Sequence, residues 1–471
     1  MKSLQLSYIT VRLLLSVIIP AIAAIPAIPA YASSDAPSSS YTVSGTITGL
    51  NPGQSVTLAK NVDDMITISS GTATFTFFNP IPSNQPYSIT VQAQPATQIC
   101  TVLNNAGKST HGDISNVSVV CGVQPLYSFN TDPNEVPYST IVAGNDQYLY
   151  GTTRTGGIND HGTIFKMDSF RDSSYTILHS FENSANGKQP FGALTLGNGI
   201  FYGTTQLGGE NDAGTIFNLD PTTGSYSVLH FFTRSEGASP SFGLVLADGY
   251  LYGTTSKGGV ADRGVIFKVD PATGGFAMLH AFTAEEGGSP YGALILDKGN
   301  FYGTTTLGGV NDHGTIFKYH PNARSLSVEH SFNGSDGDFP QGALVAGQDG
   351  NLYGITNAGG VNNRGTIFKF NPTTSSLTTL HSFNGIDGNG PTALALGSDG
   401  YFYGITEYGG VNNEGTIFKI NPIDSSFTSL HSFSDSEGTR PISLVLGNDG
   451  SHFYGTTRRG GANNTGTVFS Y

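Results

Sequence analysis

The sequence predicts an all-β protein, a seven-bladed β-propeller preceded by a small β-sandwich domain. Two observations predict this fold class. The tetrapeptide Tyr-Gly-(Thr/Ile)-Thr occurs seven times at spacings of 50 to 52 residues, and such a period indicates one structural unit repeated in space. The chain also holds 63 Gly, 29 Phe and 22 Tyr with only 12% charged residues, in short alternating runs typical of strands. The repeated tyrosines are Tyr150, Tyr202, Tyr252, Tyr302, Tyr353, Tyr403 and Tyr454.

Residues 1–32 have the features of a signal peptide. The positively charged Lys2 and Arg12 precede an apolar stretch over residues 13–28. Ala-Tyr-Ala at residues 30–32 matches a small-x-small cleavage site. An uncleaved membrane anchor is the alternative, but prolines interrupt the stretch, which is barely long enough to span a bilayer. Residues 33–40 are small and polar and predict a linker.

Residues 41–122 predict a small β-sandwich domain, because six or seven short strands alternate there with turn residues. The two cysteines of the chain, Cys100 and Cys121, fall in this domain. In an exported protein an even cysteine count predicts a disulfide, and two free buried thiols are the alternative. The bridge would close a loop of about 20 residues and stabilise the fold by roughly 3 kcal/mol.

Each repeat divides into four predicted strands, which we call first to fourth. In the unit that begins at Pro340 they lie near residues 342–345, 351–356, 365–370 and 379–383. Four antiparallel strands in fifty residues match one propeller blade. The third strand places an aliphatic residue directly before Phe, so both of its faces must be covered, as blades stacked around an axis would do.

The ends of the repeat array predict a closed ring. Residues 126–129 repeat the fourth-strand pattern before the first unit, while the last unit stops at Tyr471 without a fourth strand. A ring uses this surplus strand to complete the last blade and leaves no unpaired edge. We therefore expect a propeller over residues 126–471 in which residues 126–129 close the seventh blade.

The run Gly-Gly-(Val/Ile/Ala/Glu)-Asn-(Asp/Asn)-x-Gly-Thr-Ile-Phe-Lys, preceded by Leu-Tyr-Gly-Thr-Thr, resembles the bacterial GloVer tandem repeat of choice-of-anchor repeat proteins. The resemblance covers residues 126–471 and implies a β-propeller type of repeat in a secreted or surface-exposed protein. Many members end in a sorting anchor, which this chain does not show. The family implies no established activity and no catalytic residues. Residues 41–122 resemble a small domain of exported bacterial proteins, and kelch repeats fit less well because tryptophan is absent.

The composition excludes some partners. The net charge is −13 and no basic run occurs, so we expect neither nucleic acid nor an anionic lipid surface as partner, and no membrane insertion after the leader is removed. We expect an exported protein, either secreted or held at the cell surface or in the periplasm.

Polar loops suggest two kinds of chemistry. The loop between second and third strands carries Asn or Asp in every repeat, and the loop before most first strands carries a carboxylate, such as Asp387 or Glu437. These oxygens suit Ca²⁺ or sugar hydroxyls. They also suit turns with left-handed backbone, and repetition in every blade favours that interpretation. We therefore expect no cofactor, with Ca²⁺ as the alternative.

Positions that differ between repeats on this loop face predict a recognition surface for a ligand. Neutral drift at exposed loop tips is the alternative. The candidate ligand-binding residues are Arg154, His161, Arg263, His313, Arg364, Tyr408, Arg458 and Arg459. Six histidines in the fourth strands belong to separate blades, so we expect them to serve packing or hydrogen bonding.

The sequence thus favours a secreted binding or scaffold protein that presents a propeller face to an extracellular glycan or a surface protein. The alternative is a polysaccharide-active enzyme, a glycoside hydrolase or lyase on the same fold, and a third is a self-associating surface-layer component. Hydrolysis would need two carboxylates converging at the channel mouth, whereas the first strands offer mostly Gly, Ala, Leu and Val. We assign no catalytic residue.

Overall fold

The computed structural model describes residues 39–95, 98, 100–110, 112–129, 135–168, 175–240 and 242–471. The predicted signal peptide and residues 33–38 of the predicted linker lie outside these ranges. The protein is all-β: the one helical element within the described ranges is a 3-10 turn, η1 (Ser184–Asn186). Across the same ranges, no helix combines the length and the apolar character that crossing a bilayer requires.

The first part of the chain forms two four-stranded sheets and a small pair of strands. One sheet has the order β5 (Thr74–Thr76), β2 (Val43–Thr48), β10 (Ile114–Cys121), β8 (Cys100–Leu103). The other has the order β4 (Asp64–Ser69), β3 (Ser55–Lys60), β7 (Pro86–Ala93), β9 (Ala106–Lys108). The pair is β1 (Ser40–Tyr41) with β6 (Ile81–Pro82). Inward-facing residues of both sheets, such as Val56 and Val119, share one buried hydrophobic cluster.

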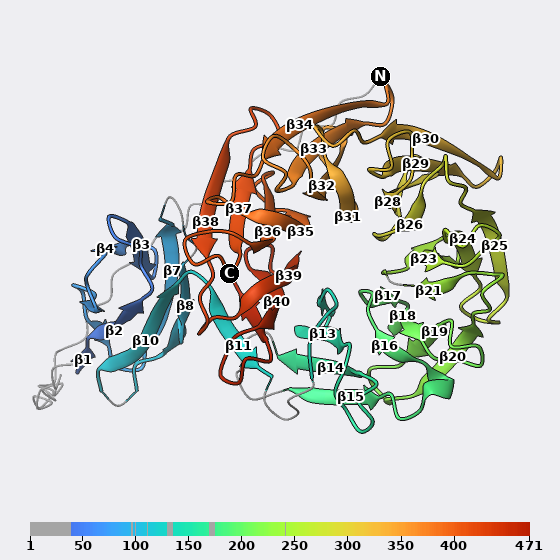
Figure 1. The fold of residues 1–471 in the computed structure, drawn as a ribbon. Coiled ribbons are helices and arrows are strands. Elements are labelled where there is room, and N and C mark those ends of the chain that lie inside the picture. Colours follow the sequence, from blue (N-terminus) through green and yellow to red (C-terminus); the bar gives the residue numbers. More distant parts are fainter. Residues whose placement is uncertain are drawn as a thin grey trace, which may run out of the picture.

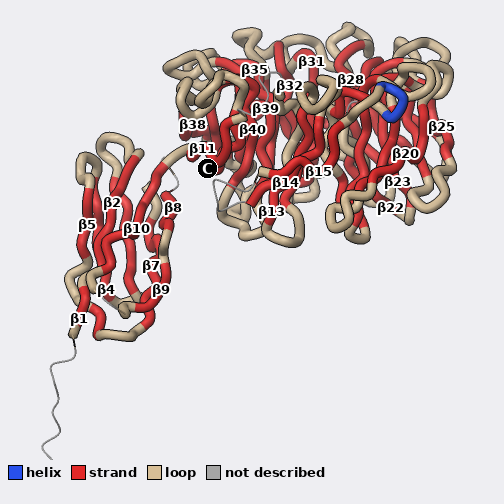
Figure 2. The backbone as a smooth tube through the Cα atoms, turned by 90° about the horizontal axis from the view of Figure 1, so that it is seen from below, coloured by secondary structure: helices blue, strands red, loops and turns tan. Residues whose placement is uncertain are grey.

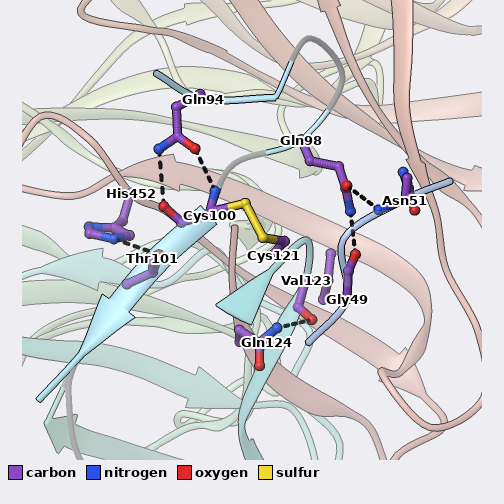
Figure 3. The surroundings of a disulfide bond; sticks show 10 residues. All are labelled: Gly49, Asn51, Gln94, Gln98, Cys100, Thr101, Cys121, Val123, Gln124 and His452. Atoms are coloured by element: carbon purple, nitrogen blue, oxygen red, sulfur yellow. Dashed lines mark hydrogen bonds between the residues drawn. A yellow bond between two sulfur atoms is a disulfide. The ribbon is translucent and has the colours of Figure 1, made fainter. Parts of the chain in front are cut away.

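The predicted disulfide between Cys100 and Cys121 is confirmed, and it joins β8 to β10 where the two cysteines lie opposite each other (Figure 3). Gln94 holds the same point of β8, because its side chain accepts from Cys100 N at 2.8 Å and donates to Cys100 O at 3.0 Å. The bridge therefore ties the end of the last strand of this domain to its neighbour.

The repeat region forms seven sheets in the described residues, arranged around a common centre (Figure 1). The first is β12 (Val142–Ala143), β13 (Tyr148–Thr153), β14 (Thr163–Asp168), β15 (Thr176–Ser180). The second is β16 (Lys188–Pro190) with β17 (Thr195–Gly197), then β18 (Ile200–Leu207), β19 (Thr215–Leu219), β20 (Tyr226–Phe231). The third is β21 (Ala238–Pro240) with β22 (Val245–Ala247), then β23 (Tyr250–Lys257), β24 (Val265–Val269), β25 (Phe276–Ala281).

The remaining four sheets follow the same plan. The fourth is β26 (Gly288–Pro290) with β27 (Ile295–Asp297), then β28 (Asn300–Leu307), β29 (Thr315–His320), β30 (Ser325–Ser331). The fifth is β31 (Asp338–Ala346), β32 (Leu352–Ala358), β33 (Thr366–Asn371), β34 (Ser376–Ser382). The sixth is β35 (Asn389–Leu396), β36 (Phe402–Tyr408), β37 (Thr416–Ile420), β38 (Phe427–Ser432). The seventh is β39 (Thr439–Leu446), β40 (Phe453–Arg459), β41 (Thr467–Ser470) and β11 (Gln124–Ser128).

The two sequence motifs of the repeat meet across neighbouring strands. The glycine of Tyr-Gly-x-Thr lies opposite the phenylalanine of Gly-Thr-Ile-Phe, as Gly404 lies opposite Phe418. A Cβ on Gly404 would lie 2.3 Å from Cζ of that ring, so only glycine leaves room for it. The threonines pair as well, with 2.8 Å between Oγ1 of Thr406 and Oγ1 of Thr416. These glycine–phenylalanine and threonine–threonine contacts explain why the two motifs recur together.

The ends of the array pair with each other. β11 runs antiparallel to β41, with Tyr127 opposite Val468 and Ser128 opposite Thr467. The observed strand begins at Gln124, two residues before the predicted segment, and ends one residue before it does. Strand β11 thus occupies the outer position of a sheet whose other three strands come from the end of the chain.

The first domain lies beside the seventh sheet (Figure 2). Only Gly122 and Val123 separate the end of β10 from the start of β11. The domains also touch through Thr101, whose Oγ1 lies 3.1 Å from Nε2 of His452 (Figure 3). A short connection and a side-chain contact both fix the junction.

Candidate ligand-binding site

The innermost strand of each sheet bulges toward the centre of the ring. In the second sheet Pro190 lies opposite Thr205 and Thr195 opposite Tyr202, so five residues of one strand span three of the other. Proline cannot donate to the ladder, and a bulge re-aims the side chains beside it. Three sheets therefore have five strands in place of the four predicted, because this bulge splits the first strand. Figure 1 shows inner strands such as β21 and β31 bordering the centre.

Four aromatic side chains from the bulges of four consecutive repeats gather at this centre. Tyr138 and Phe191 have ring centroids 5.5 Å apart, Phe191 and Phe242 5.9 Å, and Phe242 and Tyr291 4.4 Å. Phe191 also lies 6.3 Å from Tyr291, although their sheets are not neighbours, so the cluster reaches across the ring. All four side chains are half-buried.

Two arginines adjoin the same cluster. The guanidinium carbon of Arg458 lies 4.3 Å from the ring centroid of Tyr138, and that of Arg154 lies 5.2 Å from it. Arg458, in β40, also pairs with Glu407 at 2.7 Å. Arg154, directly after β13, donates to Gln189 Oε1 at 3.3 Å. Cation–π contact with Tyr138 thus brings together residues from the two ends of the repeat array.

The pKa of Tyr291 depends on its burial and on the charged groups around it. Burial raises the pKa of its hydroxyl; nearby Arg458 and Arg154 lower it, while Tyr138 and Glu407 raise it. The net effect is an upward shift, so the hydroxyl stays protonated and able to donate a hydrogen bond. Two arginines, a carboxylate and two phenols therefore lie within electrostatic reach of one point.

The four aromatic rings and Arg458 border a cavity of ≈ 280 Å³. Its wall combines the four rings and Arg458 with small residues of the bulges and with Gln341, Thr392 and Ile442 from the fifth to seventh repeats. Small-molecule sites have this composition, mostly apolar with a few convergent polar groups, and the volume is just below the usual range of about 300–1,000 Å³. The arrangement can stack a flat ligand, donate to it from arginine and tyrosine, and exclude water from one side of it.

Of the eight sequence-predicted ligand residues only Arg458 lines this cavity, and Arg154 lies beside it against the rings of Tyr138 and Phe191. Tyr408 stacks with Arg440 at 5.1 Å, and His313 pairs with Asp338 at 3.0 Å, both away from the cavity wall. The other four do not line the cavity either. They are His161, Arg263, Arg364 and Arg459.

The Asn and Asp residues of the loops after the second strands make turns. Their side chains accept from the first glycine of Gly-Gly in every repeat, at 2.7 to 3.1 Å, and they take a left-handed backbone with φ from 50° to 58°. This is the turn chemistry that the sequence favoured over a cation site. The residues are Asp160, Asp212, Asp262, Asp312, Asn363, Asn413 and Asn464. Among the described residues, no three His, Cys, Asp or Glu side chains are placed to hold a metal ion.

Five of the six fourth-strand histidines pair with the loop carboxylate six residues after them, and His179 instead stacks on Tyr226. Nε2 of His381 lies 3.0 Å from Asp387, which also accepts from Asn384 N at 2.9 Å. The same pairing occurs in four other repeats, at distances from 2.9 to 3.8 Å. The sequence analysis placed these histidines in packing or hydrogen bonding but missed their partner, which the constant six-residue spacing could have revealed.

A larger cavity of ≈ 600 Å³ lies at the junction of the two domains. Several of its polar side chains already have partners: Tyr403 donates to Asp399 at 2.9 Å, and His452 contacts both Asp449 and Thr101. We place the candidate site at the centre of the ring, where the arginine donors are not all used.

Sequence analysis missed the four aromatic residues of the cavity. They occupy the first or second position after a proline that recurs in each repeat. The residue directly after that proline differs among repeats, being Tyr138, Phe191, Ser241, Tyr291, Gln341, Thr392 and Ile442. Variation at a fixed position was the signal used for the loops, and it would have found these residues also.

The chain belongs to the Gloeobacter/Verrucomicrobia repeat family, whose model matches residues 64–261, 214–411 and 387–471. This agrees with the resemblance seen in the sequence, although the first match begins inside the first domain. A comparison with curated protein sequences finds no match.

Solved structures similar to this chain show a propeller-like fold. The extracellular domain of a putative one-component system from B. thetaiotaomicron has 11% identity and a TM-score of 0.52, over 74% of this chain and 40% of that one. The extracellular domain of a putative hybrid two-component system from the same organism has 14% identity and a TM-score of 0.50, over 74% and 41%. Virginiamycin B lyase from Staphylococcus aureus has 13% identity and a TM-score of 0.51, over 74% and 98%. The chain thus spans about 40% of the length of the two extracellular domains. At these identities the likeness concerns the fold alone.

Proposed function

We propose that this protein is an exported binding protein that holds part of an extracellular glycan in the cavity at the centre of its ring. The observation that carries the proposal is the cavity itself, where four half-exposed aromatic rings converge with Arg458, while Arg154 lies against two of those rings. Aromatic platforms with a few polar groups suit flat ligands with polar edges, as sugars are. A surface protein, the second partner that the sequence suggested, would need a much larger contact area than a cavity of ≈ 280 Å³ offers.

The architecture behind this proposal is a seven-bladed β-propeller over residues 126–471 and a β-sandwich over residues 41–122, after a signal peptide at residues 1–32. The seven sheets and the pairing of β11 with β41 support the propeller. Two sheets around one hydrophobic cluster support the sandwich. The disulfide supports export, since disulfides persist in oxidising compartments. Two of the similar solved structures are extracellular domains, which agrees with it.

The enzyme alternative has less support. The described residues that line the cavity include no carboxylate, and Glu407 reaches it only through its ion pair with Arg458. Glycoside hydrolysis ordinarily uses two carboxyl groups on either side of the scissile bond. We therefore propose binding without turnover.

A glycan array tests the proposal, with the protein and four variants. We expect at least one glycan to bind, and we expect Tyr291→Leu or Arg458→Ala to weaken that binding about tenfold or more, because each removes a group at the cavity. Arg324→Ala, at an exposed turn between β29 and β30, is the matched control and should bind normally. Loss of binding on Arg459→Ala, with Arg458→Ala unaffected, would move the site to the loop face and refute the cavity.

A further inference from the structure

The cavity has a positive charge in an acidic protein. The chain has 21 basic and 34 acidic residues, a net charge of −13. Yet Arg458 is the one charged residue among the described residues that line the cavity, and Arg154 stacks on two of its rings, Tyr138 and Phe191. Glu407 offsets one of the two positive charges. An excess positive charge in a partly enclosed, low-dielectric site favours an anionic ligand.

Each of the two arginines also has one hydrogen-bond donor without a partner. The Nε atoms of Arg154 and Arg458 are buried without a hydrogen-bond partner in the described structure. A buried donor without an acceptor is unfavourable, and most such groups in proteins are satisfied by a partner, by water or by a ligand. The guanidinium presents its donors in a planar fork that matches the two oxygens of a carboxylate. The excess positive charge and the planar donor fork thus point to a carboxylate.

The rest of the wall fits the body of a sugar. The half-exposed faces of Phe191, Phe242 and Tyr291 offer an apolar platform for the C–H face of a pyranose ring. Gln341 and Thr392, on the opposite part of the wall, offer an amide and a hydroxyl for sugar hydroxyl groups. A volume of ≈ 280 Å³ suits one sugar unit of a longer chain.

We propose that the cavity binds a hexuronic acid unit of an acidic polysaccharide. Its carboxylate lies against the guanidinium groups of Arg154 and Arg458, and its ring packs on the aromatic cluster. This inference rests on the proposed glycan binding and narrows it to one class of sugar.

Calorimetric titration with three matched probes tests it: trigalacturonate, its full methyl ester, and galactotriose. The ester keeps the shape of the acid and removes its charge. We expect the acid to bind at least about tenfold more tightly than either neutral probe, since hydrogen bonds to charged groups are the stronger ones. Its affinity should also fall as salt is raised from 0.05 to about 0.5 M, because screening weakens the pairing.

Variants assign the effect to the arginines. Arg458→Gln and Arg154→Gln should each weaken binding of trigalacturonate about tenfold and leave binding of the ester within about threefold. Arg324→Gln, an exposed arginine outside the cavity, should change neither affinity. Circular dichroism and thermal melts of all variants exclude misfolding. If one arginine variant does not fold, the other still tests whether the arginines bind the carboxylate.

The outcomes separate this inference from the proposed function. Equal binding of acid and ester, or tight binding of galactotriose, overturns the uronic acid and leaves glycan binding in place. Preference for a 6-sulfated galactoside over trigalacturonate also overturns it and assigns the anion to sulfate. If none of these probes binds, the inference fails, and if no glycan of the array binds either, the proposed function fails with it.

Discussion

The packing of glycine against phenylalanine within each sheet makes a quantitative prediction for Gly404→Ala. An added Cβ would lie 2.3 Å from Cζ of Phe418 and 2.7 Å from the carbonyl oxygen of Ala393. The Phe418 ring is fully buried, with Phe383 at 5.2 Å and Phe427 at 5.5 Å, so it has no free space to move into. Overpacking of this kind costs about 1–3 kcal/mol. Replacing glycine gains back about 0.4–1 kcal/mol from the unfolded chain, so we expect a net loss of about 1–2 kcal/mol.

Differential scanning calorimetry measures this loss as a fall in Tm of a few degrees. Gly275→Ala is the matched control, because Gly275 is exposed and its nearest neighbour to a new Cβ is Thr273 Oγ1 at 3.3 Å. A double variant with Phe418→Leu should lose less than the two single variants together, since leucine removes the colliding ring. If Gly404→Ala is as stable as Gly275→Ala, or if the double variant is additive, the proposed reason for the repeat motif is wrong.

Two further predictions concern pH and the disulfide. Burial alone would raise the pKa of Asp387 and Glu437, but hydrogen bonds from His381 and His431 and from backbone N–H groups outweigh it, so both pKa values lie below the ordinary 3.8 and 4.5. The resulting stabilisation is complete above about pH 5 and is lost as the pH falls through the lowered pKa values. Tm should therefore decrease as the pH is lowered from about 4.5, and this decrease should be less steep in Asp387→Asn. An identical dependence of Tm on pH in the variant would contradict this. Reducing the disulfide or making Cys100→Ser should destabilise the first domain by about 3 kcal/mol and leave the unfolding of the repeat region unchanged, and a thermogram without any shift would count against it.

Much of the fold could be predicted because the number of repeats and the order of their strands are visible in the sequence. Seven copies of one motif predicted seven sheets, and the surplus strand before the first copy predicted that residues 126–129 pair with the end of the chain, as β11 does with β41. The disulfide and the turn role of the loop Asn and Asp residues also follow from local chemistry. Each of these depends on neighbours in sequence or on regular pairing.

The site could not be predicted in the same way, because it arises from irregular and distant contacts. Tyr138 and Arg458 lie at opposite ends of the array and meet only because the ends pair. Phe191 and Tyr291 meet across the ring, at bulges whose direction no strand periodicity gives. Residues on the loop tips, such as Arg364, vary as much as those of the cavity but point elsewhere. Variation between repeats therefore marked candidates without showing which of them converge.

A crystal structure of the protein grown with trigalacturonate tests the central claim most directly. The account predicts sugar density in the central cavity, with a carboxylate against Arg154 and Arg458 and a pyranose ring on the aromatic cluster. An ordered sugar bound on the outer loops or at the domain junction, with the central cavity empty, would contradict it.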